Sequence, residues 1–127
     1  MAIEVGLQAG LVHTVTPDDT AWALGSGDVD VLATPRLLGL AEAATVAALA
    51  QEKLPAGQTS VGTRMEVEHL RATAVGETVT VAAQLVHVDG RLLRFEVAVT
   101  DDADRLVGRV VVTRVLVDRE RFEHRAG

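Results

Sequence analysis

Apolar residues along this chain follow two different spacings, which predict one helix among several strands. Between residues 37 and 50 only Glu42 and Thr45 carry a polar side chain, and a helix that apolar is expected to be buried on every face. The stretch is too short and too rich in alanine for a membrane span. Thr34 and Pro35 precede it as at a typical helix start: a hydroxyl residue that can accept a backbone N–H, then a proline.

Alternation of apolar and polar residues predicts strands over residues 7–16, 58–73, 77–88, 92–100 and 106–117. In the second of these strands, alternation places His69 on the apolar side and Ser60 on the polar side. The apolar side is made up of Thr59, Val61, Thr63, Met65, Val67 and His69. Asp89 and Gly90 lie between two alternating runs, which is a strong hairpin signal. Gly108 within the last strand indicates a bulge or a close backbone approach.

The order of these elements predicts an α+β fold. One helix cannot cover both faces of the sheet, so we expect an antiparallel β-sheet wrapped around one long central α-helix. At 127 residues the chain is expected to form a single domain over residues 1–127, ending in a solvated run of charges at 118–127. The acidic, glycine-containing stretch at residues 17–30 is predicted to form a loop or short helix, in which Trp22 is interpreted as a packing anchor.

Composition excludes several classes of function. A net charge of −6 and 2% aromatic residues argue against a nucleic-acid partner. The absence of cysteine removes disulfides, thiolate metal ligands and cysteine nucleophiles. The four histidines lack the spacing of a metal site, so no metal is expected. The sequence begins without a basic segment followed by an apolar run, so we expect no secretion signal, a cytoplasmic location and no membrane partner.

Three polar residues stand out against this apolar background. Glu42 lies in the middle of the predicted buried helix, where an unpaired carboxylate costs several kcal/mol; it faces either a water-filled edge or a functional site. His69 on an apolar strand face is either a satisfied structural residue or part of the same site. Thr34 is either a plain helix cap or a site residue, and the two roles are compatible.

Four segments together resemble the fluoroacetyl-CoA thioesterase-like family of hotdog-fold thioesterases. The segment VLATPRLLGLAEAA is similar to that family's helix start, with a threonine eight residues before a glutamate. The segment SVGTRMEVEHLRATAVGETVTV is similar to its valine–glycine–threonine run followed by a histidine. VDGRLLRFEV and VDRERF are similar to its hairpin and terminal strand. The ordered set with matching spacings carries the resemblance, which covers residues 11–122.

This resemblance implies a set of site residues. The family's threonine, glutamate and histidine fall on Thr34, Glu42 and His69, which would be catalytic. The glycine near the thioester falls on Gly62, and the arginine that helps to hold substrate falls on Arg114. No cofactor is implied, because CoA is part of the substrate.

The chain departs from the family in two places. The family often has glycine and histidine shortly before its late arginine, where this chain has Val110 and Val112. Members selective for fluoroacetyl-CoA resemble one another in a phenylalanine-bearing lid before the helix, where this chain has LGSGD at residues 24–28. We therefore expect little preference for the fluorinated substrate.

The resulting hypothesis is an acyl-CoA thioesterase that hydrolyses short or medium acyl-CoA. The alternatives are a non-enzymatic acyl-CoA-binding hotdog module and, less favoured, a hotdog hydratase, which is expected to carry a closely spaced aspartate–histidine pair. Thr34 and Glu42 lie about 12 Å apart along one helix axis at 1.5 Å per residue. We therefore expect the site to form at the two-fold interface of a homodimer, with such dimers able to pair further.

Overall fold

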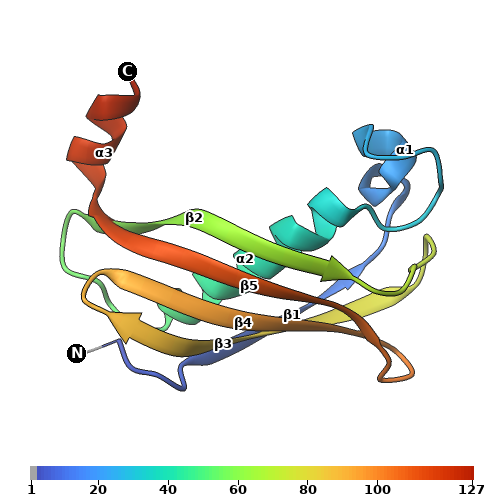
Figure 1. Ribbon diagram of the computed structural model, residues 1–127, viewed down its shortest axis with the longest axis horizontal. Coiled ribbons are helices and arrows are strands. Elements are labelled where there is room, and N and C mark those ends of the chain that lie inside the picture. The colour runs from blue at the N-terminus through green and yellow to red at the C-terminus, as the bar shows by residue number, and fades with distance from the viewer. Residues whose placement is uncertain (1–2) are drawn as a thin grey trace.

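The computed structural model describes residues 3–127, in which a curved five-stranded antiparallel sheet wraps around one long helix (Figure 1). The strands are β1 (Gln8–Thr14), β2 (Gln58–His69), β3 (Thr78–Asp89), β4 (Leu92–Asp101) and β5 (Leu106–Asp118). They lie in the spatial order β1-β3-β4-β5-β2. The helices are η1 (Pro17–Asp19), α1 (Ala21–Leu24), α2 (Thr34–Ala50) and α3 (Arg119–Ala126). The predicted architecture is therefore confirmed, with α2 as the central helix.

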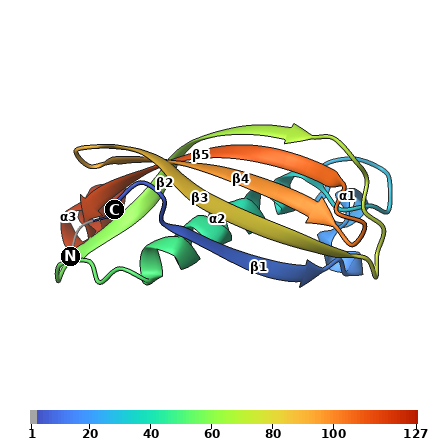
Figure 2. The same ribbon diagram turned by 90° about the horizontal axis from the view of Figure 1, so that it is seen from below.

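Alanines on the sheet-facing side of α2 let the helix lie close against the strands (Figure 2). Ala41, Ala44 and Ala48 are fully buried, and the sheet meets them with larger side chains such as Phe95. The other fully buried side chains of the strands include Val79, Val81, Leu85, Leu93, Val99, Val107 and Val112. Burial of each such side chain contributes about 1.5–3 kcal/mol, so this single layer of contacts positions α2.

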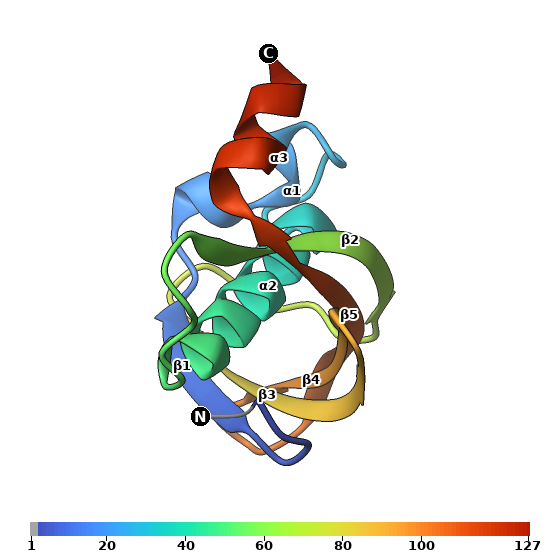
Figure 3. The same cartoon turned by 90° about the vertical axis from the view of Figure 1, so that its left-hand side faces the viewer.

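The side of α2 turned away from the sheet is not covered by any part of residues 3–127 (Figure 3). Gly39, Ala43 and Ala50 are exposed there, and the side chain of Val46 is 50% exposed. The predicted burial on every face is thus reached on the sheet side only. No helix within residues 3–127 is long and apolar enough to cross a membrane.

A bulge in β2 changes which side chains face the helix. Gly62 pairs with Arg114 of β5, and the next paired residue is Arg64, so Thr63 is the inserted residue. Paired residues of antiparallel strands project to the same face, and Arg114 is buried. The predicted alternation is therefore wrong for the first half of β2, where Ser60 and Gly62 share the helix side; Met65, Val67 and His69 keep it in the second half.

The turns and termini follow local sequence with some differences. The β3–β4 hairpin turns at Gly90 and Arg91, one residue later than predicted, with Gly90 at φ 58°. The expected close approach at Gly108 is confirmed, because a Cβ there would lie 2.8 Å from the carbonyl oxygen of Glu68. The interpretation of Trp22 as a packing anchor is wrong, because that residue is 68% exposed. The predicted run of charges at 118–127 is solvated but forms the exposed helix α3.

Candidate active site

Thr34 is the first residue of α2, and its hydroxyl is directed at His69. The distance from Thr34 Oγ1 to His69 Nδ1 is 2.8 Å. Ala33 occupies the N-cap position, where no side chain caps the helix. The interpretation of Thr34 as a plain helix cap is therefore wrong: its hydroxyl reaches across to the end of β2 instead.

His69 ends β2, where it pairs with Gly108 of β5. Its other ring nitrogen, Nε2, is buried and has no hydrogen-bond partner in the described part of the chain. Burial lowers the pKa of His69 below its ordinary value of 6.5, and a weaker contact with the backbone of Arg71 acts in the opposite direction. With the proton of the neutral ring on Nε2, Nδ1 accepts the hydrogen bond from Thr34, which is the arrangement that a general base requires.

Glu42 lies two turns further along α2 and pairs with Arg114 of β5. Arg114 Nη1 donates to Glu42 Oε2 at 3.2 Å. The other two nitrogens of the guanidinium bond Ser60, with Nε donating to its hydroxyl at 3.0 Å and Nη2 to its carbonyl oxygen at 3.1 Å. Burial lowers the pKa of Arg114, whereas the Glu42 carboxylate raises it.

These contacts give Arg114 a role that its sequence position did not reveal. Arg114 is 5% exposed, so the position of its guanidinium is set by Ser60 and Glu42 within the chain. Sequence reasoning missed Ser60, because strict alternation placed it on the opposite face of β2. Only the bulge at Thr63 could have identified it; Gly62, the residue before it, is a glycine inside a strand and so a signal of a bulge, but the predicted alternation was continued through it.

Gly62 lies directly against the Glu42 carboxylate. A Cβ at this position would contact Glu42 Oε2 and would lie 2.6 Å from Met65 Cε. A larger residue at position 62 would therefore displace the carboxylate or the methionine. Glu42, Gly62, Ser60 and Arg114 consequently form one group, which we call the carboxylate cluster.

The predicted site residues thus form two groups in one chain: the Thr34–His69 pair and the carboxylate cluster. Along α2 the two groups are about 12 Å apart. A pocket of about 330 Å³ adjoins the Thr34–His69 pair alone. Its walls come from the segment before α2 and from the residues that follow β2, and they include Ala21, Gly27, Val29, Leu32 and Leu70. These side chains are small or aliphatic, which suits an apolar group.

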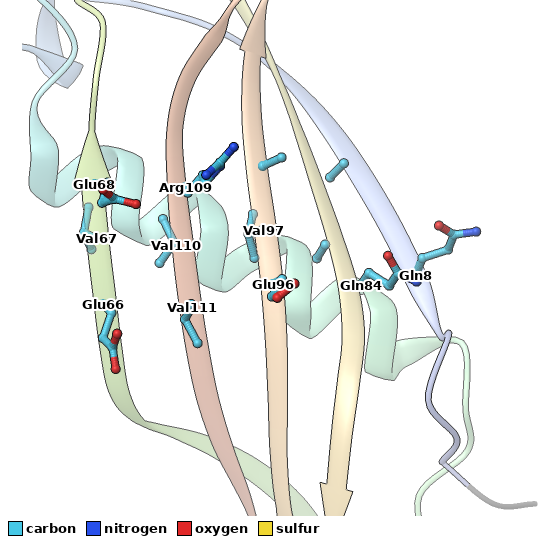
Figure 4. Close-up of a pocket in the computed structure, with 13 residues that line it drawn as sticks. Gln8, Glu66, Val67, Glu68, Gln84, Glu96, Val97, Arg109, Val110 and Val111 are labelled. Carbon is cyan, nitrogen blue, oxygen red and sulfur yellow. The ribbon is translucent and has the colours of Figure 1, made fainter.

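A larger hollow, of about 780 Å³, lies elsewhere. Figure 4 shows that it lies on the outer face of the sheet, with α2 behind the strands. Glu66, Glu68 and Glu96 line it together with Arg109. Three carboxylates against one guanidinium disfavour an anionic ligand such as CoA. Residues 3–127 also contain no cluster of three or more histidines and carboxylates that could hold a metal ion.

The fold and its similarity to solved structures place the chain in the class of hotdog thioesterases. A hot-dog-like protein from Thermanaerovibrio acidaminovorans superposes with a TM-score of 0.87 at 26% identity, covering 96% of this chain and 89% of that one. The structure of the fluoroacetyl-CoA thioesterase FlK superposes with a TM-score of 0.89 at 32% identity, covering 99% of this chain and 96% of that one.

Sequence comparison identifies the family within this class. The model of the fluoroacetyl-CoA-specific thioesterase family matches residues 15–120. The fluoroacetyl-CoA thioesterase of Streptantibioticus cattleyicolor is 40% identical over 93 residues, which cover 73% of this chain and 66% of that enzyme. The chain belongs to the fluoroacetyl-CoA-specific thioesterase family, whose members are thioester hydrolases.

Proposed function

We propose that this protein hydrolyses short or medium acyl-CoA thioesters to the free acid and CoA. The observation that carries the proposal is the Thr34–His69 hydrogen bond beside a pocket lined mainly with small and aliphatic side chains, with Arg71 as the one cationic side chain in its wall. The related enzyme FlK has been solved with acetyl-CoA in a threonine-to-serine variant, and with fluoroacetate and CoA in a phenylalanine-to-alanine variant. These complexes support an acyl-CoA as the ligand of this chain.

Thioester hydrolysis needs an oxygen nucleophile, a proton acceptor and donors for the oxyanion that develops on the carbonyl. In the proposed reaction the Thr34 hydroxyl, or a water molecule beside it, attacks the thioester carbonyl while His69 accepts the proton. The first turn of α2 provides backbone N–H groups without partners inside the helix, and its positive dipole end favours the oxyanion. Collapse of the tetrahedral intermediate breaks the C–S bond, and the thiolate takes up a proton as CoA leaves. If Thr34 attacks, water then hydrolyses the acyl-threonine.

The carboxylate cluster joins this reaction most simply across a two-fold axis. Glu42 is too far along α2 to meet its own Thr34, whereas the exposed apolar face of α2 offers a surface for a second copy. We therefore propose a homodimer in which Glu42 of one protomer serves the Thr34–His69 pair of the other, as base or as orienting group. Pairing of two such dimers is compatible with this arrangement.

We further propose that the enzyme shows little preference for fluoroacetyl-CoA. Discrimination by one small group in an apolar pocket is worth about 1–3 kcal/mol, and only where the walls fit closely. Residues 24–28 are all exposed and contain no aromatic side chain, and Trp22 points into solvent. Ordinary short or medium acyl groups suit so open a wall. The proposed enzyme works in the cytoplasm, needs no cofactor and binds neither nucleic acid nor membrane.

The release of CoA thiol from acetyl-, fluoroacetyl-, butyryl- and octanoyl-CoA tests the proposal. We expect hydrolysis of the unsubstituted substrates, and a ratio of kcat/KM for fluoroacetyl- to acetyl-CoA below about 10³. A larger ratio contradicts the proposed substrate range. Binding of these esters without any release of thiol favours instead the non-enzymatic acyl-CoA-binding module.

A further inference from the structure

A buried carboxylate, Asp19, lies outside both groups of the candidate site. It ends η1 and is 4% exposed, in the short polar run TPDDT. A buried carboxylate persists only where hydrogen bonds or opposite charges compensate for its lost hydration. The neighbours of Asp19 provide both, and they come from two separate stretches of the chain, residues 13–16 and 33–36.

One oxygen of Asp19, Oδ2, accepts hydrogen bonds from the end of the first strand and the turn after it. Thr16 donates its backbone N–H at 2.7 Å and its hydroxyl at 3.0 Å. His13 Nε2 lies 2.8 Å from the same oxygen. Burial alone would raise the pKa of Asp19, but these bonds from Thr16 and His13 outweigh it and lower that pKa. The group is therefore a carboxylate at neutral pH.

The other oxygen, Oδ1, is directed at the start of α2. Arg36 Nε lies 3.0 Å from it in an ion pair whose direction is not that of a hydrogen bond. The carbonyl oxygen of Asp19 also accepts the N–H of Ala33 at 2.9 Å. Ala33 is the N-cap of α2 and Thr34 is the next residue. Asp19 thus contacts the residues on either side of the Thr34–Pro35 pair, through its backbone and its side chain.

The segment between Asp19 and Ala33 forms one wall of the pocket beside Thr34. Ala21, Gly27, Val29 and Leu32 of this segment line it. Further bonds close the segment on itself, among them Ala21 N–H to the carbonyl oxygen of Val31 at 2.9 Å. The two ends of this wall therefore meet at Asp19, next to the hydroxyl that faces His69.

We propose that Asp19 is a positioning residue: it holds the pocket wall and the first turn of α2 together and so fixes the Thr34 hydroxyl on His69. This role rests on the proposed thioesterase function. The evidence for it is the set of contacts that Asp19 makes with His13, Thr16, Ala33 and Arg36, none of which involves Thr34 or His69. Loss of the charge on Asp19 releases Arg36 and His13, and the start of α2 then shifts relative to β2. Displacement of a reacting group by about 1 Å can cost 10²-fold in rate.

The test is Asp19→Asn, compared with Asp101→Asn as a matched control. Asp101 is also a carboxylate held by backbone N–H groups and an arginine, at the β4–β5 turn. Its Oδ1 accepts the N–H groups of Ala103 and Arg105, both at 2.9 Å, and its Oδ2 pairs with the Arg105 side chain. None of these contacts involves α2 or His69. We expect Asp19→Asn to lower kcat by about 10- to 100-fold while KM changes by less than about 3-fold. Asp101→Asn should lower Tm but leave kcat unchanged.

A second readout does not depend on turnover. The ring nitrogens of His69, observed by ¹⁵N NMR well below the unfolding temperature, should change in shift and in titration in Asp19→Asn but not in Asp101→Asn. If Asp19→Asn proves unstable, Thr16→Val removes the hydroxyl bond to Asp19 and should cause a smaller change of the same kind. Unchanged His69 signals in Asp19→Asn, or equal losses of kcat in the two asparagine variants, overturn the proposal. If the wild-type protein hydrolyses none of the esters, the proposed function fails while the NMR comparison still decides the role of Asp19.

Discussion

The hydroxyl of Thr34 and the imidazole of His69 meet at 2.8 Å, although 34 residues of chain separate them. One sits on the first residue of the central helix and the other on the last residue of an edge strand. The helix start brings its unpaired N–H groups to the same place. The proposed nucleophile, its base and the donors for the oxyanion therefore lie together. The outcomes below are expected from this arrangement.

Two substitutions of Thr34 distinguish the role of its hydroxyl from that of its methyl group. Thr34→Ser keeps the oxygen that faces His69, so kcat should remain within about 10-fold of wild type, whereas Thr34→Val should lose at least about 10²-fold, the usual scale for acid–base partners. Because Thr34 caps no backbone group, neither variant should change Tm by more than a few degrees. Thiol release and thermal unfolding measure both effects. Full activity in Thr34→Val would remove this residue from the mechanism.

Glu42→Gln tests the carboxylate cluster. The amide oxygen can still accept from Arg114 Nη1. Glu42→Ala removes both this acceptor and the opposite charge of the buried guanidinium, which then keeps only its bonds to Ser60, at a cost of several kcal/mol. We expect Glu42→Gln to lower kcat by about 10²-fold with little loss of stability, and Glu42→Ala to lower both. The comparison is made by thiol release and by denaturant unfolding. Equal activity of Glu42→Gln and wild type would make Glu42 a structural residue.

Gly62→Ala should disturb the same cluster from the side of β2. The added methyl group meets Glu42 Oε2 and Met65 Cε, so the carboxylate must move and kcat should fall. Gly10→Ala is the control, because its Cβ would lie 3.2 Å from the carbonyl oxygen of Val81, away from both site groups. That variant should retain wild-type kcat. A Gly62→Ala protein with unchanged kcat would show that the carboxylate can move without consequence.

The lowered pKa of His69 predicts the acid limb of the pH profile. Burial favours the neutral ring, so the acid limb of kcat/KM should have an apparent pKa below 6.5. The unfolded chain takes up a proton on this residue first, near pH 6.5. The stability that the neutral ring contributes is therefore complete above about pH 6.5 and is lost as pH falls through the folded-state pKa.

His69→Gln should remove this part of the pH dependence of stability, whereas His87→Gln, at an exposed position, should not. Denaturant unfolding between pH 4.5 and 8 measures the difference. An acid limb of kcat/KM above 6.5 would contradict the inferred environment of His69.

The exposed side of α2 predicts the assembly. Val46→Glu places a charge in the middle of that apolar face, which should dissociate the proposed dimer and, with it, abolish hydrolysis. Val12→Glu is the matched control, because Val12 is 68% exposed on the outer face of β1. Sedimentation at micromolar concentration measures both proteins. A wild-type monomer at that concentration would contradict both the dimer and the shared site.

Local pattern alone placed the main elements of this protein. The apolar run at 37–50 predicted the central helix, and period-two alternation predicted all five strands, because burial on one side imposes a spacing that can be read without knowing the partner. The same pattern identified Glu42 as a charged residue in an apolar helix, whose lost hydration must be compensated by a partner. The resemblance to known thioesterases then added Gly62 and Arg114.

Tertiary structure decided what these residues touch. The bulge at Thr63 turned Ser60 toward Arg114, because the register of β2 depends on its pairing with β5 and not on its own alternation. Thr34 does not cap the helix, because its hydroxyl is hydrogen-bonded to the imidazole of His69 at the end of β2. In the sequence Asp19 is not distinguishable from the other acidic residues of its loop. Its proposed role depends on contacts with segments that only the folded chain brings together. Spacing along a sequence reports burial, whereas hydrogen bonds between distant segments depend on register and on the path of the backbone.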